Sequence, residues 1–165
     1  MMHTFLPAQI VLFGVIAVAQ AQGLLPLRTT GPGYDGVIIR VNEQEPSGRG
    51  VSPKSCCQWT PIEAQVREAE ALLPAFLASR DATATVRGTR VRSELQAYKR
   101  QYWGQKIGKR RQIRILLYHQ ESQVVKKGGW LKTAVGVAGG GDDYFQVTYD
   151  VERKRFSNLR VNAPL

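Results

Sequence analysis

The most regular alternation of apolar and polar positions lies between residues 60 and 77. Thr60, Pro61 and Glu63 match a helix start, with threonine as the cap, proline at the first helical position and glutamate three residues after the cap. Apolar side chains then recur at helical spacing and form one stripe, which comprises Ile62, Val66, Ala69, Leu73, Phe76 and Leu77. Because Pro74 interrupts the stripe, we expect a kink there or a helix end near Leu73.

Two β-hairpins are predicted after this helix. Residues 95–103 and 112–119 read as strands, and Gly108 between them can adopt the positive φ that a tight turn needs. Residues 144–149 and 156–162 alternate apolar and polar side chains and are typical of a second strand pair. The order of one helix followed by a β-meander is typical of an α+β domain.

The remaining segments of this region carry weaker patterns. Residues 79–93 read as a loop, and residues 131–137 form part of a connection that holds at most a short strand. The predicted architecture is therefore one main amphipathic helix packed on a four-stranded antiparallel sheet, within a domain that spans residues 59–165.

This helix-plus-meander order resembles the cystatin-like and PepSY-like domains of exported proteins. The ending Tyr144-Phe-Gln-Val-Thr-Tyr-Asp150, followed by Arg155-Phe-Ser-Asn-Leu-Arg-Val-Asn162, is similar to the C-terminal hairpin of small uncharacterised secreted bacterial proteins. The resemblance covers the last two thirds of the chain. It implies a fold and a compartment, and it implies no activity.

The first 21 residues are typical of a secretory signal peptide. An apolar run from Phe5 to Ala19 ends in Ala19-Gln20-Ala21, whose small residues suit signal peptidase. The run is shorter than the roughly 20 residues of a membrane-spanning helix, which favours a signal peptide. The positively charged residues that usually precede such a run are missing, because no Lys or Arg lies before it. Cleavage predicts a periplasmic or secreted protein with no integral membrane segment; an uncleaved anchor or a buried core helix is the alternative.

Residues 22–58 are predicted to form a flexible N-terminal arm. Gly31-Pro32-Gly33 and the segment 46–50 have turn or linker composition, with a short β-rich run at 36–41 between them. The arm carries two adjacent cysteines, Cys56 and Cys57. Neighbouring cysteines cannot close a useful loop, so free thiols, a strained vicinal disulfide and intermolecular pairing all remain open.

The charge of the chain is unusual for its size. The 165 residues carry a net charge of +10, and the segment 87–132 holds thirteen Lys or Arg against two Glu. This concentration of positive charge indicates either a surface that attracts polyanions or a solvated surface that keeps the protein soluble, and the sequence favours neither interpretation. In an exported protein, the polyanions are acidic proteins or anionic envelope polymers; nucleic acid takes their place if the chain is not exported.

No motif in the chain predicts catalysis, a metal or a cofactor. The mature chain has one histidine, His119, and a lone histidine at a strand end is more often a surface residue than a general base. The glycine-rich run 136–141 lacks the Gly-Lys-Ser/Thr of a phosphate loop, and Asp142-Asp143 lacks the spacing of a calcium loop. Adjacent cysteines with one histidine do not supply metal-ligand spacing.

These observations lead to the hypothesis of a non-enzymatic exported interaction module. Aromatic and cationic residues alternate along the first hairpin, an arrangement that suits anionic partners. The predicted partner-binding residues are Tyr98, Arg100, Tyr102, Trp103, Lys106, Lys109, Arg110, Arg111, Arg114, Lys126, Lys127 and Trp130. The alternative is a periplasmic inhibitor or immunity protein that blocks an enzyme with the loop Ser122–Trp130.

Overall fold

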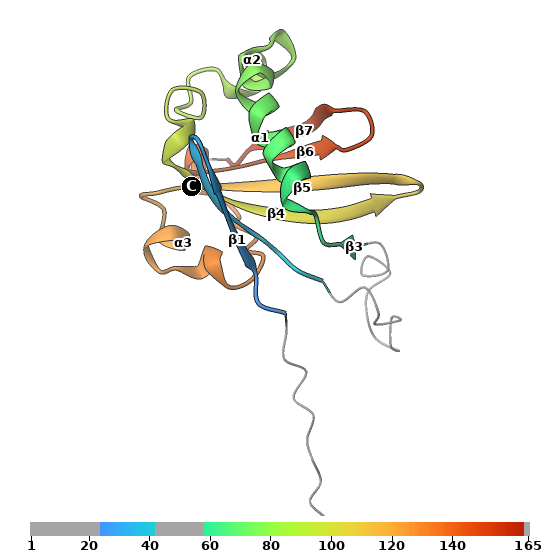
Figure 1. Ribbon diagram of the computed structural model, residues 1–165. Coiled ribbons are helices and arrows are strands. Elements are labelled where there is room, and N and C mark those ends of the chain that lie inside the picture. Colours follow the sequence, from blue (N-terminus) through green and yellow to red (C-terminus); the bar gives the residue numbers. More distant parts are fainter. Residues whose placement is uncertain (1–23, 42–57, 164–165) are drawn as a thin grey trace, which may run out of the picture.

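The computed structural model describes residues 24–41 and 58–163, which form one sheet with helices on both faces (Figure 1). Helix α1, Glu63–Ala78, crosses one face of the sheet and is followed by α2, Arg80–Val86. Helix α3, Gln123–Lys126, lies on the other face with the short helical turn η3, Gly129–Leu131. None of the helices in the described part of the chain has the length and apolar character needed to cross a bilayer.

The sheet has seven strands among the described residues, and its order is β1-β2-β4-β5-β6-β7. Strand β2 runs parallel to β4, every other pairing is antiparallel, and β3 pairs with a further stretch of β4. The strands are Leu27–Gly31 (β1), Tyr34–Ile38 (β2), Gln58–Trp59 (β3), Tyr98–Ile107 (β4), Arg110–His119 (β5), Tyr144–Asp150 (β6) and Arg155–Val161 (β7).

The two predicted hairpins are confirmed as β4–β5 and β6–β7, but the four-stranded antiparallel sheet is wrong. Three further strands extend the sheet and make it mixed: β1 and β2 come from the segment predicted to be a loosely ordered arm, and β3 lies at its end. Asp35 on β2 ties the first two of these strands to β4, because its carboxylate lies 2.8 Å from both Arg28 Nη2 on β1 and Lys99 Nζ on β4. The proposed signal peptide (1–21) and the cysteine pair lie outside the described residues.

Helix α1 begins two residues later than predicted. Ile62 is the N-cap, and its N–H donates to Gln65 Oε1 at 3.2 Å. The Thr60 hydroxyl is used elsewhere, since it accepts a hydrogen bond from the Val41 N–H at 3.1 Å. Pro74 does not end the helix, which continues to Ala78 because Leu73 and Leu77 on either side are buried against the sheet.

Other predicted loops contain short helical elements. Helix α2 lies within the predicted loop 79–93 and buries Ala82 and Val86. No strand forms over residues 131–137. Two more 3-10 turns precede β4 and β6, namely η2 (Leu95–Ala97) and η4 (Gly141–Asp143). Short apolar segments such as these are read poorly from sequence, because tertiary burial decides their conformation.

The main core lies between α1 and the sheet. The predicted helical stripe supplies Val66, Ala69, Leu73 and Leu77, all at most 1% exposed. The facing strand positions belong to β4, β5 and β6, and the buried ones are Tyr98, Tyr102, Ile113, Ile115, Leu117, Phe145, Val147 and Tyr149. A second, smaller cluster on the opposite face is built around Val37, Tyr118 and Trp130.

A buried ion pair sits inside the main core. Arg100 is 1% exposed, and its Nε lies 3.3 Å from Oε2 of Glu70 on α1. Tyr102 donates its hydroxyl hydrogen to Glu70 Oε1 at 2.9 Å, and Arg100 also donates to the Tyr98 carbonyl. Burial raises the pKa of Glu70, while the Arg100 charge and the Tyr102 hydrogen bond oppose that rise. These contacts fix where α1 sits along β4.

Removing one partner of this pair should destabilise the fold strongly. Glu70→Leu leaves a buried guanidinium without its counter-charge, so we expect a loss of about 3–5 kcal/mol in the free energy of unfolding. The triple variant Glu70→Leu, Arg100→Met, Tyr102→Phe removes every polar side chain of the group and should recover most of that loss. Urea unfolding measures both. A cost below about 1 kcal/mol for Glu70→Leu would contradict the buried ion pair.

Candidate functional site

The turns of the two hairpins meet at one end of the sheet. In an antiparallel meander, alternate turns lie at the same end, and the β5–β6 register pairs Gln112 with Asp150 directly below both turns. The Arg111 carbonyl accepts a hydrogen bond from the Val151 N–H at 3.1 Å. The β4–β5 and β6–β7 turns are therefore neighbours in space although about 40 residues separate them (Figure 1).

Both turns carry cations, and together they form what we call the basic end of the sheet. Its side chains are all exposed and comprise Lys106, Lys109, Arg110 and Arg111 from the first turn, with Arg153, Lys154 and Arg155 from the second. Two of them are paired: Arg111 Nε with Glu152 Oε1 at 2.9 Å, and Lys154 Nζ with Glu68 Oε1 at 2.5 Å. The other five form no ion pair with a carboxylate of the described residues.

The paired cations fasten the two turns to their surroundings. Glu152 accepts two hydrogen bonds from Arg111, one from the main-chain N–H at 3.0 Å and one from Nε. The side-chain bond from Arg111 is the main reason that the pKa of Glu152 is lowered. Arg111 also lies over the Trp59 ring, with its guanidinium carbon 5.5 Å from the ring centre. Arg111 therefore has a structural role, and the unpaired cations remain free to bind.

An apolar side chain lies among these cations. Ile107, at the end of β4, is 59% exposed and sits beside Lys106 at the tip of the hairpin. Gly108 follows with φ 61°, a backbone conformation that glycine adopts without strain, as the turn prediction required. The tip can therefore offer a ligand several positive charges and a small apolar contact.

Three of the predicted binding residues cannot take part in a surface. Tyr98, Arg100 and Tyr102 are at most 1% exposed, because their face of β4 lies beneath α1. These three side chains share one face of β4, and that face is the covered one although it carries Arg100. The burial of Arg100 depends on its ion pair with Glu70, which lies on a helix about 30 positions earlier in the chain. The residue pattern of the strand does not indicate this partner.

The other predicted residues outside the basic end lie in two exposed or half-buried pairs, and Trp130 is buried. Trp103 and Arg114 are neighbours in the β4–β5 register, on the sheet face opposite α1. Lys126 and Lys127 are exposed on α3, at the other end of the sheet from the basic end (Figure 1). Trp130 is 4% exposed and packs beneath two cations, Arg28 and Lys99, at 5.3 and 5.9 Å from its ring centre.

Sequence reasoning missed the contribution of the second turn. Arg153, Lys154 and Arg155 lie between the two predicted strands 144–149 and 156–162, and none of them is among the predicted binding residues. The predicted meander was sufficient to indicate that the two turns meet, because two successive hairpins place their turns at the same end of an antiparallel sheet.

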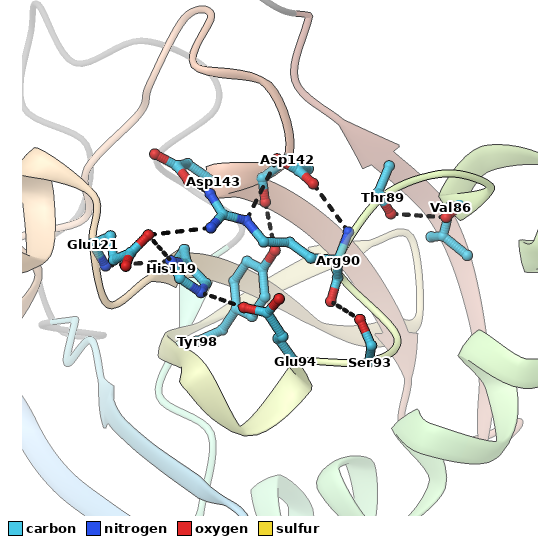
Figure 2. Close-up of polar contacts among 10 residues, drawn as sticks. All are labelled: Val86, Thr89, Arg90, Ser93, Glu94, Tyr98, His119, Glu121, Asp142 and Asp143. Atoms are coloured by element: carbon cyan, nitrogen blue, oxygen red, sulfur yellow. Dashed lines mark hydrogen bonds and ion pairs between the residues drawn. The ribbon is translucent and has the colours of Figure 1, made fainter.

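At the opposite end of the sheet, Arg90 lies among three carboxylates (Figure 2). Its Nη1 is 3.3 Å from Glu121 Oε2, its Nε is 3.6 Å from Asp142 Oδ1, and its Nη2 contacts Asp143 Oδ1. The Arg90 N–H also donates to Asp142 Oδ2 at 3.0 Å. Arg90 thereby joins the loop after α2 to the end of β5 and to η4, and carboxylates outnumber cations in this cluster.

His119 ends β5 beside this cluster, and its expected surface position is wrong, since it is 1% exposed. Its Nδ1 accepts a hydrogen bond from the Glu121 N–H at 3.3 Å, which assigns the ring hydrogen to Nε2, 3.1 Å from Glu94 Oε2 (Figure 2). The Tyr98 ring meets the imidazole edge to face at 5.0 Å. Both ring nitrogens are thus engaged in holding the end of β5, an arrangement that suits a structural role.

Among the residues that the structure describes, no group of three or more His, Cys, Asp or Glu side chains is placed to hold a metal ion. The carboxylates near Arg90 already neutralise a guanidinium. The basic end, in contrast, offers five exposed cations that have no carboxylate partner among the described residues.

Removal of the Arg90 guanidinium should weaken the contact of the loop after α2 with η4 and the end of β5. Arg90→Ala leaves three neighbouring carboxylates without their cation and should lower the free energy of unfolding by roughly 1–3 kcal/mol. The deficit should shrink in high salt, because salt screens repulsion between the exposed carboxylates. Arg92→Ala, an exposed position two residues away, should change stability by less than about 0.5 kcal/mol. Equal unfolding midpoints for the two variants would contradict this role of Arg90.

No protein-family model matches this chain, and no curated protein or solved structure matches it either. The resemblance to cystatin-like and PepSY-like domains has no support from these comparisons, and its implied four-stranded architecture is replaced by a seven-stranded mixed sheet.

Proposed function

We propose that this protein is an exported, non-enzymatic interaction module that binds an acidic protein or anionic envelope polymer through the basic end of its sheet. The observation that carries the proposal is the set of five exposed cations from two turns, Lys106, Lys109, Arg110, Arg153 and Arg155, without carboxylate partners among the described residues. Like charges held together on a rigid scaffold cost free energy, which a polyanion relieves on binding.

The distribution of charge favours one orientation of such a partner. The basic end and the carboxylates around Arg90 lie at opposite ends of the same sheet (Figure 1). The unpaired cations of the basic end therefore attract a polyanion to the hairpin turns, which raises the association rate and orients the encounter.

The loop-inhibitor alternative has less support. The segment Ser122–Trp130 folds into α3 and η3 and packs against the sheet, and its two end residues are 1% and 4% exposed. An inhibitory loop needs an apolar anchor that can enter the cleft of another protein. Trp130, the largest apolar side chain of this segment, is instead used within the second hydrophobic cluster.

Charge reversal at the basic end should abolish polyanion binding. The probes are poly-L-glutamate and lipopolysaccharide, with single-stranded DNA as the probe for a nucleic-acid role. We expect Lys109→Glu with Arg110→Glu to weaken binding of the envelope-type probes by about tenfold or more, and the addition of Arg153→Glu with Arg155→Glu to remove it. Titration by fluorescence anisotropy measures each dissociation constant.

The matched control is Lys126→Glu with Lys127→Glu on α3, which changes the net charge by the same amount at the other end of the sheet. It should alter affinity by less than about threefold. If the control weakens binding as much as the hairpin variant does, net charge and not the basic end is responsible. Preferential binding of single-stranded DNA would replace the envelope partner by a nucleic acid at the same surface.

Salt provides an independent test of the same proposal. Affinity for a polyanion should fall steeply between about 50 and 200 mM salt, and the slope should become shallower in the four-site variant because fewer counterions are released. An affinity that does not change over this range would indicate apolar anchoring and would contradict the proposal.

A further inference from the structure

The sheet face opposite α1 holds a cavity of about 180 Å³. Its floor is formed by β4, β5 and β6, and its wall by the segment 134–137, which runs over the sheet between η3 and η4. The apolar part of its lining includes Leu116, Tyr118, Val135 and Val137. None of the unpaired cations of the basic end lines it, so it is a different site.

Buried polar side chains hold one end of the cavity wall in place. Gln101 is fully buried on β4, and its Nε2 donates to the carbonyls of Trp130 and Thr133 at 2.6 and 2.7 Å. Its Oε1 accepts from the Val135 N–H at 3.1 Å and from the Tyr118 hydroxyl at 2.8 Å. Burial raises the pKa of Tyr118, so the phenol keeps its hydrogen and acts as a donor.

The other end of the wall is held by Asn162, which follows β7. Its Nδ2 donates to the carbonyls of Val137 and Gly139 at 2.8 and 2.9 Å. The segment 134–137 is thus fastened to the sheet on both sides. A wall that is fixed in this way keeps the cavity open without a ligand, as expected for a preformed binding site.

One cation lines this cavity without an acidic partner. Arg114 on β5 is half-buried, and its Nε donates to Gln146 Oε1 at 3.1 Å, with a second, shorter contact from Nη2. It forms no ion pair with a carboxylate of the described residues. A neutral amide leaves the guanidinium charge uncompensated, although carboxylates are the groups that a guanidinium binds best.

A second polar group at the cavity also lacks a partner. Trp103 pairs with Arg114 across the β4–β5 register and lines the same cavity. Its indole Nε1 is buried and has no hydrogen-bond partner among the described residues. Because this nitrogen is closed off from the cavity surface, Trp103 contributes its ring to the wall, and the cavity combines one uncompensated cation with aromatic and aliphatic walls.

We infer that this cavity binds a small organic acid whose carboxylate pairs with Arg114 and whose apolar body has the size of a single ring. The volume sets the size limit, because a cavity of roughly 150 Å³ holds one benzene molecule. Arg114 supplies the charge recognition through the part of its guanidinium that Gln146 does not occupy, and Val135, Val137 and Leu116 surround the body. The site is independent of the proposed polyanion surface.

Benzoate is the first probe, and benzyl alcohol serves as its neutral counterpart of similar size. We expect benzoate to bind the wild-type protein with a dissociation constant of about 1 mM or tighter, and benzyl alcohol to bind about tenfold more weakly. Acetate, which lacks the ring, should bind no better than benzyl alcohol. Ligand-observed NMR and quenching of tryptophan fluorescence report the binding, the latter because Trp103 lines the cavity.

The charge requirement is tested with Arg114→Gln, and its matched control is Arg67→Gln on α1, which removes one charge from the opposite side of the sheet. Arg114→Gln should weaken benzoate about tenfold and leave benzyl alcohol within about twofold, whereas Arg67→Gln should bind as the wild type does. The basic-end variant Lys109→Glu with Arg110→Glu should retain benzoate binding, which separates this site from the polyanion surface.

Several results would overturn the inference. They are the absence of benzoate binding to the wild-type protein at millimolar concentrations, equal affinity for benzoate and acetate, and unchanged benzoate affinity in Arg114→Gln. The first two comparisons use the unmodified chain, so they decide the matter even if Arg114→Gln does not fold.

Discussion

A carboxylate and a guanidinium share the otherwise apolar space between α1 and the sheet, and the rest of the structure depends on their pairing. Glu70 and Arg100 are both almost completely buried, and each would be costly there without the other. Tyr102 completes the group through its hydroxyl. Apolar contacts have little directionality, whereas the ion pair and the Tyr102 hydrogen bond link one position of α1 to one stretch of β4. This link sets the positions of Leu73 and Leu77 over the sheet and buries the face of β4 that carries Arg100.

Helix α1 covers only one face of the sheet, so other segments must cover the opposite face. The β1–β2 hairpin lies against the edge of β4, and α3, η3 and the segment 134–137 cover the central strands. Gln101 and Asn162 attach this cover through side-chain hydrogen bonds to main-chain carbonyls. A cover built from irregular backbone fits the sheet less closely than a helix does, and a cavity remains beside Arg114. The same feature that closes the second face therefore creates the place for a small ligand.

The charges of the chain are sorted by the topology of the sheet. The β4–β5 and β6–β7 turns bring seven exposed cations to one end, and the carboxylates around Arg90 occupy the other. A net charge of +10 spread evenly over the surface would give solubility with little directional preference. The seven cations at the two adjacent turns instead give a polyanion a defined binding surface, and the paired residues Arg111 and Glu152 keep those turns together.

Local patterns in the sequence determined the helix over residues 63–78, both hairpins and the cationic turn at 106–111, because periodicity and turn chemistry act over a few residues. They did not predict that β2 would pair in parallel with β4, since Asp35 and Lys99 are 64 positions apart and nothing near either residue indicates the other. The burial of Arg100, the meeting of the two basic turns and the cavity beside Arg114 were likewise decided by the tertiary structure. Each of these features depends on which face of a strand is covered, and that is settled by distant segments competing to bury apolar surface and to satisfy polar groups.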